Sequence, residues 1–335
     1  MIPVRSGAYS VGLPAALVAT ALWGFTFLGP AVIAPLNVYY LVVGRYAVFG
    51  VMSLTVLALN SAKARELGAR NFLKAMHLGV VGYIGFYLLL SLSTRIGGGV
   101  LASTLTGLIP AMVALASNVF EKALNWRRLL LPIVVMSGGL LLVDSASSAA
   151  DRAGVSAGQT LLGIVLGVSA CLAWAYFVIA NGIILKRAKT PIDNVVWTAS
   201  IGTGAFGASL LLVPLARAGG GPSPFHDAGT FWHYLAWCAA LAVLGSWCAT
   251  WFWNAATKRL PTTVMGPIIG MEAVFGVVFN LMRERRLPTS YELWGGLLVV
   301  TGVFLCAYLF NRALAAAARR REAAQQFPLR VHGIE

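Results

Sequence analysis

The chain has 335 residues, of which 59% are hydrophobic and 11% charged, and its mean hydropathy is +0.79. A soluble domain of this size exposes far more polar surface, so the composition excludes a soluble globular protein. The formal net charge of +14 would suit nucleic acid if the basic residues formed one patch, but they lie in separate short segments. We therefore expect an integral membrane protein that has the lipid bilayer as a partner and no nucleic acid.

Successive apolar runs along the chain are each long enough to cross a hydrocarbon core of about 30 Å as an α-helix. They predict ten transmembrane helices, at residues 13–33, 36–59, 72–92, 97–119, 129–146, 161–184, 195–216, 231–256, 261–282 and 293–310. The runs are continuous and do not alternate in polarity, which argues against membrane strands. The first run resembles a signal peptide, but it lacks a small-residue cleavage site and nine runs follow it, so we predict a first span.

The distribution of basic residues predicts the orientation. With both termini in the cytoplasm, 18 of the 25 Lys and Arg residues fall in inner segments, six fall in outer segments, and Arg45 lies within a span. This asymmetry follows the positive-inside rule. We predict a multi-pass protein of the cell inner (plasma) membrane with cytoplasmic termini, and the sequence leaves its oligomeric state open.

The sequence contains an internal repeat. Residues 107–142 align without a gap to residues 270–305, at an offset of 163. The matches that apolar composition does not explain are the charged pairs Arg95/Lys258, Glu121/Glu284 and Lys122/Arg285. A repeat of this length has the size of a bundle of several membrane helices. Five helices per copy is an odd number, so the second copy enters from the opposite side, and we predict two inverted five-helix repeats.

Short segments along both copies resemble the drug/metabolite transporter (DMT) superfamily, whose members pair two EamA domains. The segments are ALWGFTF around Trp23, GRYAVFG around Arg45, LAWAYF around Trp174, and WGGLLVVTGVFL at residues 294–305. The chain matches the family pattern only in part within the ninth predicted helix and before the tenth. It reads Met-Glu-Ala at 271–273 where the family has Glu-Pro, and Arg-Glu at 283–284 where the family has Gly-Glu.

The resemblance implies four parts: a first EamA-like repeat (11–146), an outer linker (147–160), a second EamA-like repeat (161–311) and a basic cytoplasmic tail (312–335). It also implies a secondary transporter or exporter of a small organic metabolite that works by alternating access around a central cavity. The segment at 250–262 is similar to the amino-acid exporter branch, so amino acids are the leading substrate. The alternatives are a nucleotide-sugar or drug carrier, or a non-transporting protein such as a lipid scramblase or an accessory subunit.

Polar residues inside spans are the first candidates for function, because burying them in hydrocarbon is costly. Arg45 lies near the middle of the second predicted span, where it either bonds helix-end carbonyls or pairs with a substrate carboxylate. Glu272 is the one acid well inside a span. It either holds a proton or a substrate ammonium, or serves packing and helix-break geometry.

Mid-span aromatic residues are the second group of candidates. They suit a cavity that stacks apolar or planar groups, although ordinary packing is the alternative for each. The substrate-binding candidates in this group, with one neighbouring amide, are Trp23, Tyr83, Tyr87, Trp174, Trp251 and Asn254. Two prolines, Pro110 and Pro267, lie near glycines within spans and are candidates for helix breaks.

The sequence carries no pattern of an enzyme. The four histidines lie far apart without metal-ligand spacing, and no nucleotide-binding fingerprint is present. We therefore expect no catalytic residues, no metal and no cofactor, and a small-molecule substrate as the partner.

Overall fold

The computed structural model describes residues 8–97, 105–121, 125–145, 156–219 and 222–326. Within these ranges the chain is helical and contains no β-strand. Nine helical segments of the described chain are long and apolar enough to cross a membrane: Ser10–Val32, Val38–Leu59, Ser61–Gly97, Trp126–Val143, Ala157–Arg187, Asn194–Ala218, Ala228–Thr257, Thr262–Glu284 and Ser290–Phe310. The protein is therefore an all-helical membrane protein.

The fourth predicted span, 97–119, is the one without a counterpart among these nine segments, and it falls partly outside the described residues. Its described part contains the shorter apolar helix α7, Ile109–Glu121. The prediction of ten spans stays a prediction.

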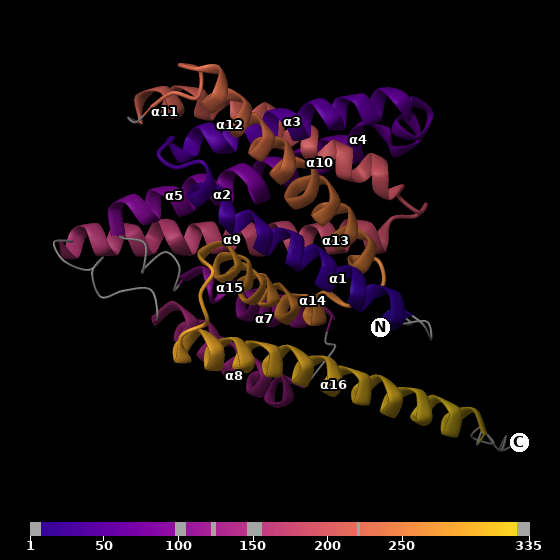
Figure 1. Ribbon diagram of the computed structural model, residues 1–335. Helices are drawn as coiled ribbons and strands as arrows, with labels where there is room; N and C mark the ends of the chain where they lie inside the picture. Colours follow the sequence, from indigo (N-terminus) through magenta and orange to yellow (C-terminus); the bar gives the residue numbers. More distant parts are fainter. Residues whose placement is uncertain (1–7, 98–104, 122–124, 146–155, 220–221, 327–335) are drawn as a thin grey trace, which may run out of the picture.

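Several spans consist of more than one helical element (Figure 1). The elements of the first half are α1 (Ala8–Phe25), the 3₁₀ turn η1 (Thr26–Leu28), α2 (Gly29–Val32), α3 (Val38–Leu59), α4 (Ser61–Gly79), the π-helical segment η2 (Val80–Gly85), α5 (Phe86–Gly97), α7 and α8 (Trp126–Ser145). Those of the second half are α9 (Ala157–Arg187), α10 (Asn194–Ser209), η4 (Leu210–Leu212), α11 (Val213–Ala218), α12 (Ala228–Ala240), the π-helical segment η5 (Leu241–Cys248), α13 (Ala249–Thr257), α14 (Thr262–Ile269), α15 (Met271–Glu284) and α16 (Ser290–Gln326).

Side-chain caps begin several of these helices, because the first backbone N–H groups of a helix have no partner within it. Asn37 accepts from the N–H of Tyr39 at the start of α3. Asp193 accepts from two N–H groups at the start of α10, and Asp227 caps α12 in the same way. At the start of α9, Ser156 and Gln159 form a capping box.

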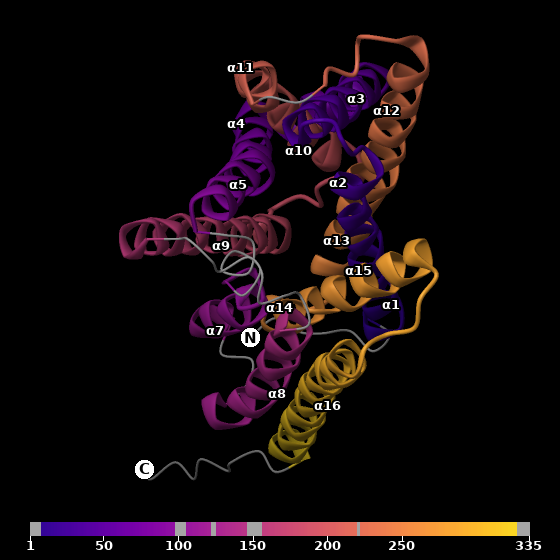
Figure 2. The ribbon, with the colours of Figure 1, turned by 60° about the vertical axis from the view of Figure 1, so that its left-hand side comes forward.

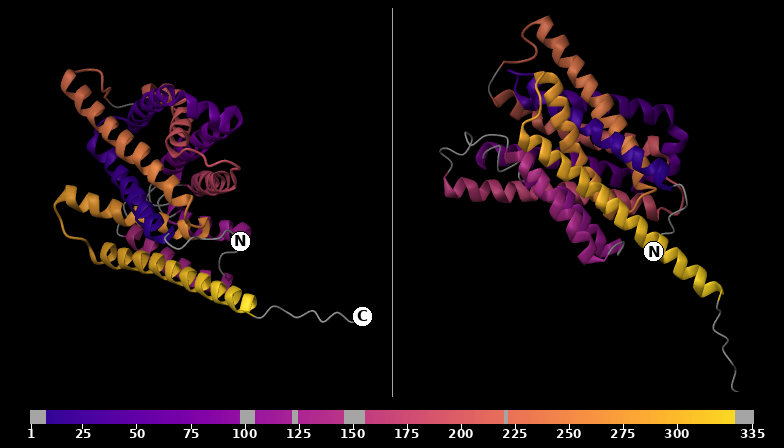
Figure 3. Two further views of the ribbon diagram at one scale, coloured as in Figure 1. Left: turned by 90° about the vertical axis from the view of Figure 1, so that its right-hand side faces the viewer. Right: turned by 60° about the horizontal axis from the view of Figure 1, so that its bottom comes forward.

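Three helices extend beyond the spans that hydropathy predicts. The predicted third span starts at 72, but α4 begins at Ser61 and turns at Gly68, whose φ of 74° suits a residue without Cβ. The long helix α9 starts at Ala157, inside the predicted linker. The last helix continues to Gln326, and its end projects away from the other helices (Figure 3). Hydropathy locates only the apolar part of a helix, so polar extensions escape it.

Helices that hold corresponding places in the two halves of the chain pack against each other. Extensive contacts pair α3 with α10 and α8 with α16, and α7 packs on α14, which belongs to the span that corresponds to its own. The third helix of each half also packs on the first helix of the other half. In this way α5 packs on α9, and α13 packs on α1. In Figure 2, α8 and α16 lie side by side at one edge of the molecule, away from α3 and α10.

Two glycines allow α8 and α16 to approach closely, and they are equivalent in the repeat. A Cβ on Gly139 would lie 2.6 Å from the carbonyl oxygen of Gly295. A Cβ on Gly302 would lie 2.8 Å from the carbonyl oxygen of Pro132. The offset of 163 relates Gly139 to Gly302 and Pro132 to Gly295, so the same contact occurs twice. Small residues that bring membrane helices together in this way strengthen van der Waals packing.

Candidate functional site

Two π-helical segments lie at corresponding places in the two halves. Segment η2 contains Gly82 and segment η5 contains Gly245, and the offset of 163 relates these glycines. Each glycine admits a neighbour from the first helix of the other half: Phe177 lies against Gly82, and Thr26 lies against Gly245. A π turn disturbs the regular helical hydrogen bonds and is frequent at functional sites.

Arg45 reaches from α3 to the second of these π segments. Its Nε donates to Oγ of Ser246 at 2.8 Å, and its Nη2 donates to the carbonyl oxygen of Gly245 at 3.0 Å. The guanidinium carbon also lies 5.4 Å from the centre of the Tyr46 ring. Arg45 is partly exposed, and its Nη1 makes no hydrogen bond to the described residues. Hydrogen bonds therefore hold the Nε–Nη2 edge of the guanidinium, whereas Nη1 has no hydrogen-bond partner among the described residues.

Glu272 lies in the first turn of α15. Only Gly270, whose φ of −56° and ψ of −24° are helical, separates this helix from α14. Glu272 is close enough to Arg45 for electrostatic interaction. It is partly exposed and makes no hydrogen bond or ion pair to any described residue.

The helix that carries Glu272 is broken beside it. The break is at Gly270, three residues after Pro267, and the N–H of Gly270 bonds the carbonyl oxygen of Pro267 at 3.0 Å. The first half has a turn at residues 107–108, immediately before α7. Pro110 is the second residue of α7. Gly107 and Gly270 are equivalent at the offset of 163. Both candidate prolines therefore lie within a few residues of a break at the same place in each half.

An aromatic cluster fills the centre of the bundle next to these breaks. The rings of Trp23 and Trp174 are edge-to-face with centroids 5.4 Å apart. Trp253 lies 5.0 Å from Trp23, and Tyr83 lies 6.2 Å from Trp174. Tyr83 also hydrogen-bonds Thr250 across helices. The structure thus brings together three of the predicted candidates, but it buries them almost completely, with exposed fractions of 3% to 7%.

Asn254 belongs to a buried chain of hydrogen bonds. Trp197 Nε1 donates to Oδ1 of Asn181, whose Nδ2 donates to Oδ1 of Asn254, both at 2.8 Å. The Nδ2 of Asn254 in turn donates to Oγ1 of Thr198 at 3.1 Å. All of these side chains are fully buried, so the polar groups of Asn254 already bond other protein groups.

The two remaining aromatic candidates are partly exposed. Tyr87 lies on α5. Trp251 lies on α13, edge-to-face with Phe252. Sequence reasoning missed Ser246, which anchors Arg45. The signal available was its position next to Gly245, one of the matched glycines of the repeat.

Three lysines join helix ends on the side that the sequence predicts to be cytoplasmic, and we call them the lysine latch: Lys63, Lys186 and Lys258. Lys63 bonds Asp193 at 2.9 Å, Lys186 donates to Thr262 at 2.9 Å, and Lys258 donates to the carbonyl oxygen of Ile192 at 2.7 Å. Burial lowers the pKa of Lys258 from its usual value, more than the nearby Asp193 raises it. The latch ties α4, α9 and α13 to the segments that begin α10 and α14.

The second half of the chain has a recognisable family signature. Residues 161–308 match the EamA-like transporter family. The match to the EamA-like family covers the helices from α9 to most of the membrane part of α16, including the π segment that binds Arg45 and the helix that carries Glu272.

Two further comparisons extend over most of the chain. The inner membrane protein YtfF of Escherichia coli (strain K12) is 24% identical over 309 residues, which cover 88% of this chain and 94% of that protein. A solved structure, described only as the crystal structure of a protein, is similar with a TM-score of 0.71. It covers 92% of this chain and 99% of its own at 15% identity, so it shows a shared fold alone.

Proposed function

We propose that this protein is a secondary transporter of the DMT superfamily, located in the inner membrane, that carries small zwitterionic metabolites such as amino acids. The observation that carries this proposal is the placement of Arg45 and Glu272. They are oppositely charged, partly exposed and close enough to interact, yet no ion pair joins them in the structure. The match of residues 161–308 to EamA-like transporters supports the same function.

The two side chains suit the two charges of an amino acid. The Nη1 edge of Arg45 offers planar donors of the kind that bind a carboxylate. The free carboxylate of Glu272 can accept from an ammonium group. A zwitterion between them would neutralise both charges, which is the usual requirement for charged groups in a membrane interior.

Alternating access is the mechanism that the internal repeat favours. Transporters built from inverted repeats rock one bundle against another around a site at broken helices near the membrane middle. Here the helix breaks and the π segments recur at matching positions, and corresponding helices pair. The lysine latch supports a state that is closed at the cytoplasmic end, because its bonds cross between segments that would have to separate there.

Counterflow in proteoliposomes tests this function. Vesicles preloaded with an unlabelled amino acid should accumulate the labelled one, whereas the corresponding amine and the deaminated acid should compete weakly, since each lacks one charge. A panel of nucleotide sugars and lipophilic cations tests the carrier alternatives. Movement of labelled lipid between leaflets without any solute exchange would instead support a scramblase and overturn the proposal.

A further inference from the structure

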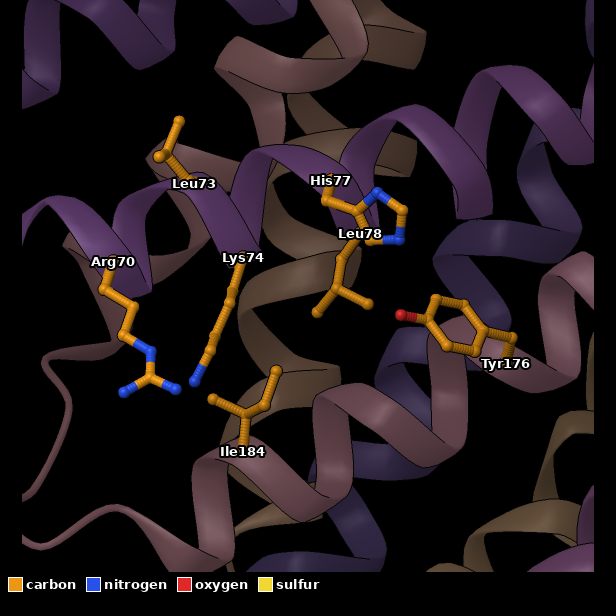
Figure 4. A pocket seen from close by; sticks show the side chains of 7 residues that line it. All are labelled: Arg70, Leu73, Lys74, His77, Leu78, Tyr176 and Ile184. Carbon is orange, nitrogen blue, oxygen red and sulfur yellow. The ribbon is translucent and has the colours of Figure 1, made fainter.

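A groove at the surface of the protein combines basic and apolar side chains. It lies between α4 and α9 and has a volume of about 300 Å³. Its lining residues are Arg70, Leu73, Lys74, His77, Leu78, Tyr176 and Ile184. Figure 4 shows the side chains of Arg70 and Lys74 extending in the same direction towards Ile184, while the hydroxyl of Tyr176 points towards His77 and Leu78.

The two cations in the groove have no partner among the residues that the structure describes. Arg70 and Lys74 are four residues apart on one face of α4, so their charges repel each other mildly. Neither forms an ion pair or hydrogen bond with a described residue, although Lys63 on the same helix does. An anion placed between them would relieve the repulsion and accept several charge-assisted hydrogen bonds.

The groove lies at the depth where lipid headgroups are expected. The charged part of α4 ends with Lys74 and His77, and no charged residue follows until Arg95. On α9 the charges start at Lys186, two residues after Ile184. The boundary between charged and apolar sequence therefore passes through the groove on both helices, and such boundaries mark the membrane interface.

We propose that this groove binds the headgroup of an anionic phospholipid. Arg70 and Lys74 hold the phosphate. The apolar wall below it, with Leu73 62% exposed and Tyr176 47% exposed, contacts the acyl chains. A soluble phosphate would gain nothing from this wall, so the groove fits a lipid and not a free anion. Basic pockets between membrane helices bind anionic headgroups by the same chemistry.

Binding of phosphatidylglycerol to the purified protein in detergent, measured by native mass spectrometry, tests the proposal. The double variant Arg70→Gln/Lys74→Gln should bind roughly 10- to 30-fold more weakly, given the contribution of each basic residue near a lipid surface. The lipid affinity of Arg70→Lys should fall between those of the wild type and the double variant, because it keeps the charge and loses the planar fork. The matched control is Arg127→Gln/Arg128→Gln, which removes two exposed cations from the start of α8 and should bind as the wild type does.

Three results would overturn the proposal. An equal loss of phosphatidylglycerol affinity in the control variant would indicate diffuse charge attraction. Equal affinity of the wild type for phosphatidylcholine would show that the anionic headgroup is not recognised, and equally tight binding of glycerol 3-phosphate would indicate a site for a soluble anion. Both cations are at the surface, and the melting temperature without lipid checks that each variant is folded.

Discussion

Arg45 on α3 donates from Nε to Oγ of Ser246 on the π segment η5, at 2.8 Å. With its second bond to the carbonyl oxygen of Gly245, the guanidinium joins the second helix of one half to the irregular turn of the other half. A hydrogen bond from a charged group contributes about 1.5–3 kcal/mol, so these bonds fix the position of the guanidinium. Its open Nη1 edge is the part that we expect to contact substrate.

The first prediction separates the two roles of Arg45. Arg45→Lys keeps the charge but loses the planar fork, so it should bind carboxylate-bearing substrates about tenfold or more weakly while staying monodisperse. Ser246→Ala is the matched control, since it removes one anchoring bond and leaves the Nη1 edge intact. Equilibrium binding and size-exclusion profiles distinguish the cases. A Lys variant that does not fold would assign Arg45 a structural role alone.

The second prediction concerns Glu272 and coupling to protons. Glu272→Gln mimics the protonated carboxyl at nearly constant volume. If this carboxylate carries the coupling proton, the variant should lose the response of uptake to an imposed pH gradient and keep gradient-free counterflow, because exchange needs no net proton movement. Glu66→Gln, an exposed acid on α4, serves as the control. Full pH-gradient dependence in the Glu272→Gln variant would remove Glu272 from the coupling mechanism.

The third prediction tests the contact between α8 and α16. Gly139→Leu places a side chain against the backbone of α16 and should lower the free energy of unfolding by about 1–3 kcal/mol, as overpacking does. Gly302→Leu should have a similar effect at the equivalent contact. Gly138→Leu is the control, because a Cβ there meets no atom within 4 Å. Thermal unfolding in detergent gives the comparison, and equal melting temperatures for the 138 and 139 variants would contradict it.

The fourth prediction uses the titration of Asp193. Burial opposes its ionisation, but hydrogen bonds from Lys63 and from the N–H groups of Val196 and Val195 outweigh burial and lower the pKa below its usual value of 3.8. A lowered pKa in the folded state means that the carboxylate stabilises the protein above the ordinary Asp pKa. This contribution is lost as the pH falls through the folded pKa, below about 4.

Asp193→Ala should therefore cost about 0.5–2 kcal/mol at neutral pH, the range measured for lost N-caps. Asp193→Asn keeps a cap and loses only the exposed ion pair with Lys63, which is worth about 0–1 kcal/mol. The difference in melting temperature between wild type and Asp193→Ala should shrink on acidification below pH 4. A constant difference down to pH 3 would show that the charge of Asp193 does not contribute.

The fifth prediction tests the inverted topology. A cysteine at Ser148, which lies outside the described residues, should react with an impermeant maleimide from outside the cell. A cysteine at Ala188, directly after α9, should react only after the membrane is permeabilised. Equal labelling of both from outside would end the inverted-repeat interpretation.

The sequence by itself determined the membrane class, the approximate position of nine described spans and the repeat offset, because these depend on local hydropathy and on residue identity. It also singled out Arg45 and Glu272, since charge within an apolar run is visible without a structure. The pairing of corresponding helices, the approach at Gly139 and the hydrogen bonds of Arg45 came only with the tertiary structure. These contacts join residues far apart in the chain: the partner of Arg45 is 201 residues away. Apolar periodicity is nearly uniform around a membrane helix, so it does not indicate which face meets which neighbour, and that choice is made by close packing in three dimensions.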